Sequence, residues 1–124
     1  MNKKNDAKHG GSKSKEVVLS FLKSLNAEDF KTARDYVNDN MTFDGVLGSR
    51  NGADAYFKDM SKMKFKYEIE KAFSDGDDVC MLYDINMSGT KIFTCGWYHL
   101  ENGKISSLKV VFDPRSVLKA SDKK

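Results

Sequence analysis

Apolar residues in the first third of the chain recur at the spacing of a helical face. They fall at i, i+1, i+4, i+5 and i+8, at Val17, Val18, Phe21, Leu22 and Leu25. Because an α-helix turns once every 3.6 residues, these positions share one side, and the pattern predicts a helix from Lys13 to Leu25. Residues 1–12 before it are polar and contain Gly10 and Gly11, so we expect them to form a disordered basic tail.

Two shorter helices and one short strand are predicted next. Asn26 is suited to cap a second helix, with Phe30, Ala33 and Val37 on its buried face and its end at residues 38–40. A short strand, an irregular glycine-containing loop and a third helix follow, at 41–44, 45–52 and 53–60.

The second half of the chain consists of short apolar or alternating segments separated by turn residues. Residues 65–70 alternate apolar and polar side chains, which is typical of a strand with one face in water. Asn102-Gly103 is the strongest hairpin signal in the sequence. The pattern therefore predicts an antiparallel meander of strands at 65–70, 79–88, 92–101 and 104–112.

Together these elements predict an α+β fold. Three N-terminal helices cannot cover both faces of such a sheet, so we expect them to close one end of a curved antiparallel sheet. The result is a cone-shaped domain around an internal pocket. The length of 124 residues suits one domain, which we assign to 13–114, with a second basic tail at 115–124.

The formal net charge of +3 conceals an uneven distribution. Residues 1–15 and 115–124 hold 9 of the 21 basic and 2 of the 18 acidic residues, so the body between them is negatively charged. A nucleic-acid-binding domain carries its basic residues on the folded surface. We therefore expect no nucleic-acid partner.

Composition also argues against a membrane protein and against a metal site. No stretch approaches the roughly 20 apolar residues of a membrane span, and residues 1–15 lack the apolar segment of a secretory signal, which favours the cytoplasm. The two cysteines, Cys80 and Cys95, and the two histidines, His9 and His99, lack the paired spacing of a zinc site. We expect no membrane partner, no metal and no cofactor.

The order of elements and three segments of the sequence resemble the nuclear transport factor 2-like superfamily. The segments are FLKSLNAEDF at 21–30, Asn51-Gly52 before the third helix, and Asn102 to Ile105 leading to Phe112-Asp113-Pro114. Within the superfamily, residues 14–114 are most similar to SnoaL-like polyketide cyclases and ketosteroid isomerases. The resemblance implies a conical fold, an apolar pocket between helices and sheet, and dimerisation through the outer sheet face.

The resemblance also implies where the catalytic groups of a ketosteroid isomerase would stand. These are a helix tyrosine, a strand aspartic acid and a carboxylate general base. The tyrosine position falls on Phe21, the base position on Gly45 beside Asp44, and the strand aspartic acid position on Gly96 or Cys95. Because none of these residues supplies the required group at its own position, steroid isomerisation is disfavoured.

The epoxide hydrolases of the superfamily are disfavoured in the same way. Their Arg–Asp pair and second Asp correspond to Leu82, Asp84 and Val110. Only Asp84 matches, so the resemblance indicates the fold more strongly than any activity.

Strand parity sorts the side chains into a pocket face and an outer face. A Gly89-Thr90 turn pairs Tyr83 with Gly96 and Met81 with Tyr98. By analogy with the family, the pocket is predicted to be lined by Phe21, Leu25, Phe43, Met81, Tyr83, Ile85, Tyr98, Leu108, Val110 and Phe112. The outer face then carries Cys80, Leu82, Asp84, Cys95 and Trp97, with the cysteines several residue pairs apart, which argues against a disulfide.

The turn at Asn102-Gly103 leaves one alternative open. A two-residue turn pairs Tyr98 with Ser107 and directs Leu108 outward, whereas a longer loop with a bulge pairs Tyr98 with Leu108 and keeps both inside. Because a slip of one residue reverses the face of every side chain, Trp97 and Tyr98 exchange roles between the two versions. We prefer the bulged version.

Four side chains are candidates for chemistry. Asp44 is the best candidate for a general base at the pocket mouth, and the alternative is a solvated turn residue. Tyr83 and Tyr98 are candidates to orient a ligand carbonyl or hydroxyl, and the alternative is that they are ordinary core tyrosines. His99 is expected on the outer face, at the surface or in an interface.

Two functions follow from these residues. The first is a SnoaL-like domain that binds a hydrophobic small molecule and forms a homodimer through the outer face that carries Trp97 and Leu82. The second is a cofactor-free isomerase, cyclase or hydrolase of a small apolar ring compound, with Asp44 as general base. Loss of the isomerase residues favours the first.

Overall fold

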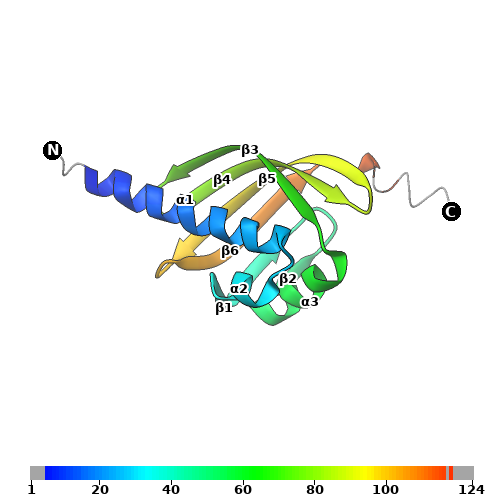
Figure 1. The fold of residues 1–124 in the computed structure, drawn as a ribbon, viewed down its shortest axis with the longest axis horizontal. Helices are drawn as coiled ribbons and strands as arrows, with labels where there is room; N and C mark the ends of the chain where they lie inside the picture. Colours follow the sequence, from blue (N-terminus) through cyan, green and yellow to red (C-terminus); the bar gives the residue numbers. More distant parts are fainter. Residues whose placement is uncertain (1–4, 117, 119–124) are drawn as a thin grey trace.

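A curved six-stranded sheet wraps around a long helix in the computed structural model, which describes residues 5–116 and 118 (Figure 1). The strands follow the order β2-β1-β6-β5-β4-β3 across the sheet. The elements are α1 (Asn5–Asn26), α2 (Phe30–Arg34), β1 (Val37–Asp44), β2 (Ser49–Asn51), α3 (Ala53–Met63), β3 (Lys66–Asp75), β4 (Asp78–Met87), β5 (Thr90–Glu101) and β6 (Lys104–Phe112).

The helices lie on the concave side of this sheet, as Figure 1 shows. Helix α1 runs along strands β3 and β4, while α2 and α3 lie below its C-terminal end beside β1 and β2. The predicted α+β fold with a curved sheet and three helices is thus confirmed, and the sheet is mixed rather than wholly antiparallel, because β1 pairs in parallel with β6. Among the described residues, no helix combines the length and the apolar character needed to cross a membrane.

The second helix is shorter than predicted, and the sequence around it serves other purposes. Asp29, not Asn26, caps α2, and its side chain accepts a hydrogen bond from the backbone N–H of Thr32 at 3.1 Å. Val37, expected on the helix, begins β1 instead. It pairs in parallel with Ile105 of β6, because the edge of the meander offers its backbone a hydrogen-bonded partner. Its side chain is buried in the core.

Asn26 joins helix α1 to strand β3. Its side-chain Nδ2 donates to the carbonyl oxygen of Tyr67 at 2.9 Å, and its Oδ1 accepts from the backbone N–H of Tyr67 at 2.7 Å. The amide is therefore fully engaged across the fold and is not available as a local cap.

Two further differences concern element boundaries. Helix α1 begins at Asn5 rather than at Lys13, because adding a residue to an existing helix costs much less than nucleating one. Strand β2 was not predicted, since its three residues are all exposed and carry no apolar pattern. Parts of the predicted tails 1–12 and 115–124 lie outside the described residues, and the assignment of one domain to 13–114 stays a prediction.

The meander of β3 to β6 has the predicted order and a slightly different register. The turn between β4 and β5 lies at Ser88-Gly89, so Tyr83 pairs with Thr94 and Met81 pairs with Gly96. The shift is two residues on β5, which leaves every side chain on its predicted face.

The second hairpin settles the roles of the two neighbouring aromatic residues. A bulge between His99 and Leu100 pairs Tyr98 with Leu108, as in the preferred version. Tyr98 is accordingly 1% exposed, and Trp97 is 50% exposed on the outer face.

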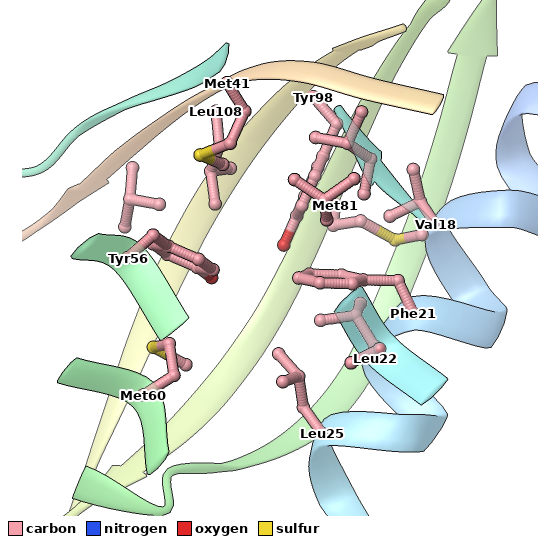
Figure 2. Close-up of a cluster of buried hydrophobic side chains, with 14 of the residues drawn as sticks. Val18, Phe21, Leu22, Leu25, Met41, Tyr56, Met60, Met81, Tyr98 and Leu108 are labelled. Carbon is pink, nitrogen blue, oxygen red and sulfur yellow. The ribbon is translucent and has the colours of Figure 1, made fainter. Parts of the chain in front are cut away.

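The core forms where α1 meets the concave face of the sheet. Figure 2 shows Val18, Phe21 and Leu22 pointing from the helix towards Met81 and Tyr98 on the strands. The rings of Phe21 and Tyr98 pack edge to face with centroids 6.3 Å apart. Since all five side chains are essentially inaccessible to solvent, this part of the cone is filled.

Candidate functional site

A cavity of about 340 Å³ lies beside this core, between helix α3, the loop that joins β1 to β2, and the sheet. Its wall is mostly apolar and aromatic. The lining side chains and backbone come from Phe43, Gly45, Val46, Leu47, Gly48, Arg50, Tyr56, Asp59, Met60, Lys62, Met63, Phe65, Tyr67, Tyr83, Ile85, Met87, Leu108, Val110 and Phe112.

The structure separates the predicted wall residues into two groups. Those that line the cavity are Phe43, Tyr83, Ile85, Leu108, Val110 and Phe112. Those that lie in the filled core instead are Phe21, Leu25, Met81 and Tyr98. The reason is that α1 packs directly onto β3 and β4, and Phe21 on its apolar face packs against Tyr98 of β5, so this part of the sheet is covered.

A pair of tyrosine hydroxyls connects the cavity to the core. Tyr83 lines the cavity, and its hydroxyl oxygen lies 2.7 Å from that of Tyr98, which is buried behind it. Gly96 makes this arrangement possible, because a Cβ at this position would overlap the Tyr83 hydroxyl oxygen and lie 3.0 Å from both Tyr83 Cζ and Tyr98 Cε1. The absence of a side chain at Gly96 therefore determines where the Tyr83 hydroxyl lies.

Two more tyrosines complete an aromatic cluster. The rings of Tyr67 and Tyr83 are 5.2 Å apart, and Tyr56 of α3 lies 5.4 Å from the ring of Phe43. Both Tyr56 and Tyr67 line the cavity.

All four tyrosines stay protonated at physiological pH. Burial raises the pKa of Tyr83 well above its ordinary value, and the hydrogen bond from Tyr98 offsets only part of this effect. Burial likewise raises the pKa of Tyr56, Tyr67 and Tyr98, and neighbouring tyrosines add to it. The cavity therefore contains neutral O–H groups, which donate hydrogen bonds and do not act as phenolate bases.

Charged residues occur only at the rim of the cavity, within the lining described above. Arg50 of β2 and Asp59 of α3 form an ion pair, with Nε and Oδ2 2.7 Å apart. Lys62 lies on the same helix. Val46 and Leu47, in the neighbouring loop, are exposed apolar side chains at the mouth.

The structure places Asp44 outside this cavity. Its side chain is exposed at the end of β1, where Oδ1 accepts a hydrogen bond from Ser49 Oγ at 2.6 Å. A general base must reach the reacting atoms, and Asp44 does not reach into the cavity. Its position therefore matches the alternative of a solvated turn residue. Asp44 is not among the lining residues.

His99 lies on the outer face, as expected. Its Nδ1 is 2.9 Å from Asp78 Oδ1, which also accepts a hydrogen bond from Trp97 Nε1 at 2.9 Å. Those two bonds, from Trp97 first and His99 second, lower the pKa of Asp78. In the part of the chain that the structure describes, no three His, Cys, Asp or Glu side chains gather in a way that could hold a metal ion.

The sequence prediction of the lining leaves out several residues, some of which had a usable signal and some of which had none. Tyr67 and Tyr56 had a signal for an inward-facing side chain, since Tyr67 alternates with polar residues in a strand and Tyr56 lies on the apolar side of a helix. Arg50 and Asp59 carried none, because an ion pair between a strand and the helix that follows it leaves no mark on hydrophobic periodicity.

Comparison with known proteins agrees with this geometry. Residues 18–108 match the family described as the SnoaL-like domain. The chain belongs to this family. Among curated proteins, none matches the sequence.

Solved structures extend the comparison. An NTF2-like protein of unknown function from Cytophaga hutchinsonii is 50% identical, with a TM-score of 0.84 over 85% of this chain and 94% of that one. An LEH-like epoxide hydrolase from M. tuberculosis is 20% identical, with a TM-score of 0.76 over 91% and 92% of the two chains. A de novo designed protein with a curved β-sheet is 18% identical, with a TM-score of 0.75 over 90% and 93%. The similarity to the latter two structures is a similarity of fold alone.

Proposed function

We propose that this SnoaL-like domain binds a small apolar ring compound that carries a hydrogen-bond acceptor, and that it does so in the cavity under α3. The observation that carries the proposal is Tyr83, which lines a mostly aromatic and aliphatic wall and whose hydroxyl oxygen lies 2.7 Å from that of Tyr98. The volume of about 340 Å³ is at the small end of the range for ligand sites.

The two hydroxyls together favour a ligand with an acceptor, such as a ketone. Tyr98 is buried behind the wall, so its hydroxyl can bond only to Tyr83 or to other core groups. When Tyr98 donates to Tyr83, the proton of Tyr83 is free to point into the cavity. A carbonyl oxygen of the ligand would then complete a chain of two hydrogen bonds in a surrounding of low polarity, where such bonds are strong.

The catalytic alternative has less support. The proposed general base Asp44 is exposed and outside the lining, and the carboxylate at the rim, Asp59, is already paired with Arg50. A cofactor-free isomerase, cyclase or hydrolase would need a free acid or base inside the wall. We therefore favour binding without an assigned reaction.

The test compares a ketone with the hydrocarbon of the same shape. We expect 2-tetralone to bind more tightly than tetralin, measured by thermal shift and by NMR titration. Tyr83→Phe should lower the affinity for the ketone about 2- to 10-fold, the effect of one hydrogen bond, and leave the affinity for the hydrocarbon unchanged.

A control at the rim separates the hydrogen bond from the shape of the site. Val46→Ala changes an exposed apolar residue at the mouth and should weaken both compounds to the same degree. The proposal is wrong if neither compound binds, or if Tyr83→Phe weakens the hydrocarbon as much as the ketone.

A further inference from the structure

The outer face of the sheet brings the two cysteines of the chain together. Cys80 of β4 pairs with Trp97, and Cys95 of β5 pairs with Leu82, so the cysteines are diagonal neighbours on adjacent strands. Their Sγ atoms are 3.6 Å apart and both are free thiols. The register expected from the sequence places them several pairs apart, and the turn at Ser88-Gly89 reduces that separation to the diagonal contact.

The distance between the two sulfur atoms is short enough for a disulfide to form with a small movement. A disulfide needs its sulfur atoms about 2.05 Å apart, so the two atoms must approach by roughly 1.5 Å. Both side chains are half-buried on the outer face, away from α1 and the cavity. Their χ1 torsions can therefore change without disturbing the core.

We propose that Cys80 and Cys95 form an oxidisable dithiol site, which a peroxide closes to a disulfide within one chain. In the first step a cysteine thiol loses its proton and the thiolate attacks one peroxide oxygen. The O–O bond breaks, a sulfenic acid forms, and the released hydroxide takes up the proton to give one water. In the second step the other thiol attacks that sulfur, the S–O bond breaks, and the S–S bond forms with release of a second water. Both sulfur atoms are oxidised by one electron each, and the peroxide is reduced by two.

The surroundings of Cys95 affect the rate of the reaction. Burial, followed by the hydrogen bond and charge of Cys80, raises the pKa of Cys95 above its ordinary value. Because the thiolate is the reactive form, closure is slow at neutral pH. The experiment is therefore run in mildly alkaline buffer.

The test treats the whole chain with hydrogen peroxide. The protein is kept at low micromolar concentration, so that association of two copies through the same face does not shield the thiols. We expect both thiols to disappear together, with a mass loss of two hydrogens, no dimer on a non-reducing gel, and full reversal by dithiothreitol. Peptide mapping should join the segments that contain Cys80 and Cys95.

The single variants Cys80→Ser and Cys95→Ser provide the matched controls. Each retains one thiol, which can only form a sulfenic acid, trapped by dimedone, or a bond between chains. Since closure within a chain has an effective concentration of at least about 1 mM, it should outpace pairing between micromolar chains by about a thousandfold.

Three results would overturn the proposal. They are dimedone adducts on both cysteines of the unaltered chain, disulfides only between chains, and thiols that persist under peroxide in the unaltered chain while the single variants react.

Discussion

At the scale of the residue, Gly96 matters because it has no side chain. It lies between two tyrosines, and any Cβ there would overlap the Tyr83 hydroxyl. Its φ is not in the left-handed region, so the requirement for glycine is one of space and not of backbone conformation. The residue that the family resemblance marked as a lost catalytic position is thus the one that makes room for the hydroxyl of Tyr83.

We therefore expect Gly96→Ala to destabilise the fold by about 1–3 kcal/mol, because the added methyl group overfills a packed site. The measurement is chemical unfolding followed by circular dichroism. Combining it with Tyr83→Phe should recover part of the loss, since removal of the hydroxyl relieves the nearest overlap. Strictly additive effects would contradict this account.

At the scale of the element, the sequence predicted faces better than boundaries. The β4–β5 register differed from expectation by two residues, and Tyr83 still faces the cavity side because parity repeats every two residues. Its helical spacing from Ala33 predicts Val37 on a helix, yet its strand partner Ile105 lies far away in the sequence. Local periodicity cannot reveal such a partner, nor the Arg50–Asp59 pair at the rim.

The three buried tyrosines, Tyr56, Tyr83 and Tyr98, and the half-buried Tyr67 come from α3, β4, β5 and β3, and they make the packing between these elements sensitive to alkaline pH. In the unfolded chain a tyrosine has a pKa of about 10, and burial raises the pKa of each in the folded state. Below pH about 10 both states are protonated and the stability is complete. Above it only the unfolded state loses protons, so the free energy of unfolding should fall by about 1.4 kcal/mol per pH unit for each tyrosine.

With four such groups, unfolding is expected within about two pH units above 10. The appearance of tyrosinate absorbance should coincide with the loss of the sheet signal in circular dichroism. Tyr83→Phe should reduce the slope of the free energy of unfolding against pH by the contribution of one tyrosine. Ionisation of these residues while the sheet signal persists would show that they are not buried as described.

At the scale of the whole molecule, the two faces of the sheet differ in what covers them. The concave face holds the core and the cavity, while the outer face has no covering element among the described residues. Phe73, Phe93, Trp97 and Val111, on β3, β5 and β6, are between 50% and 61% exposed around the cysteine pair. Apolar side chains gathered in this way are typical of an interaction surface.

We propose that a second copy of the chain covers this outer face, as the family resemblance implies, in a two-fold symmetric homodimer. Sedimentation equilibrium should then show a dimer that accumulates as the protein concentration is raised above the low micromolar range. Trp97→Glu should give a monomer whose circular dichroism signal from the sheet is unchanged. In a two-fold symmetric dimer both copies would bring the new charge into the apolar interface. Leu47→Glu is the matched control, since Leu47 is 59% exposed but lies at the cavity mouth, and it should leave the dimer intact. A monomer at every concentration, or equal loss of dimer in both variants, would assign the exposed face to another partner and leave the cavity as a site within a single chain.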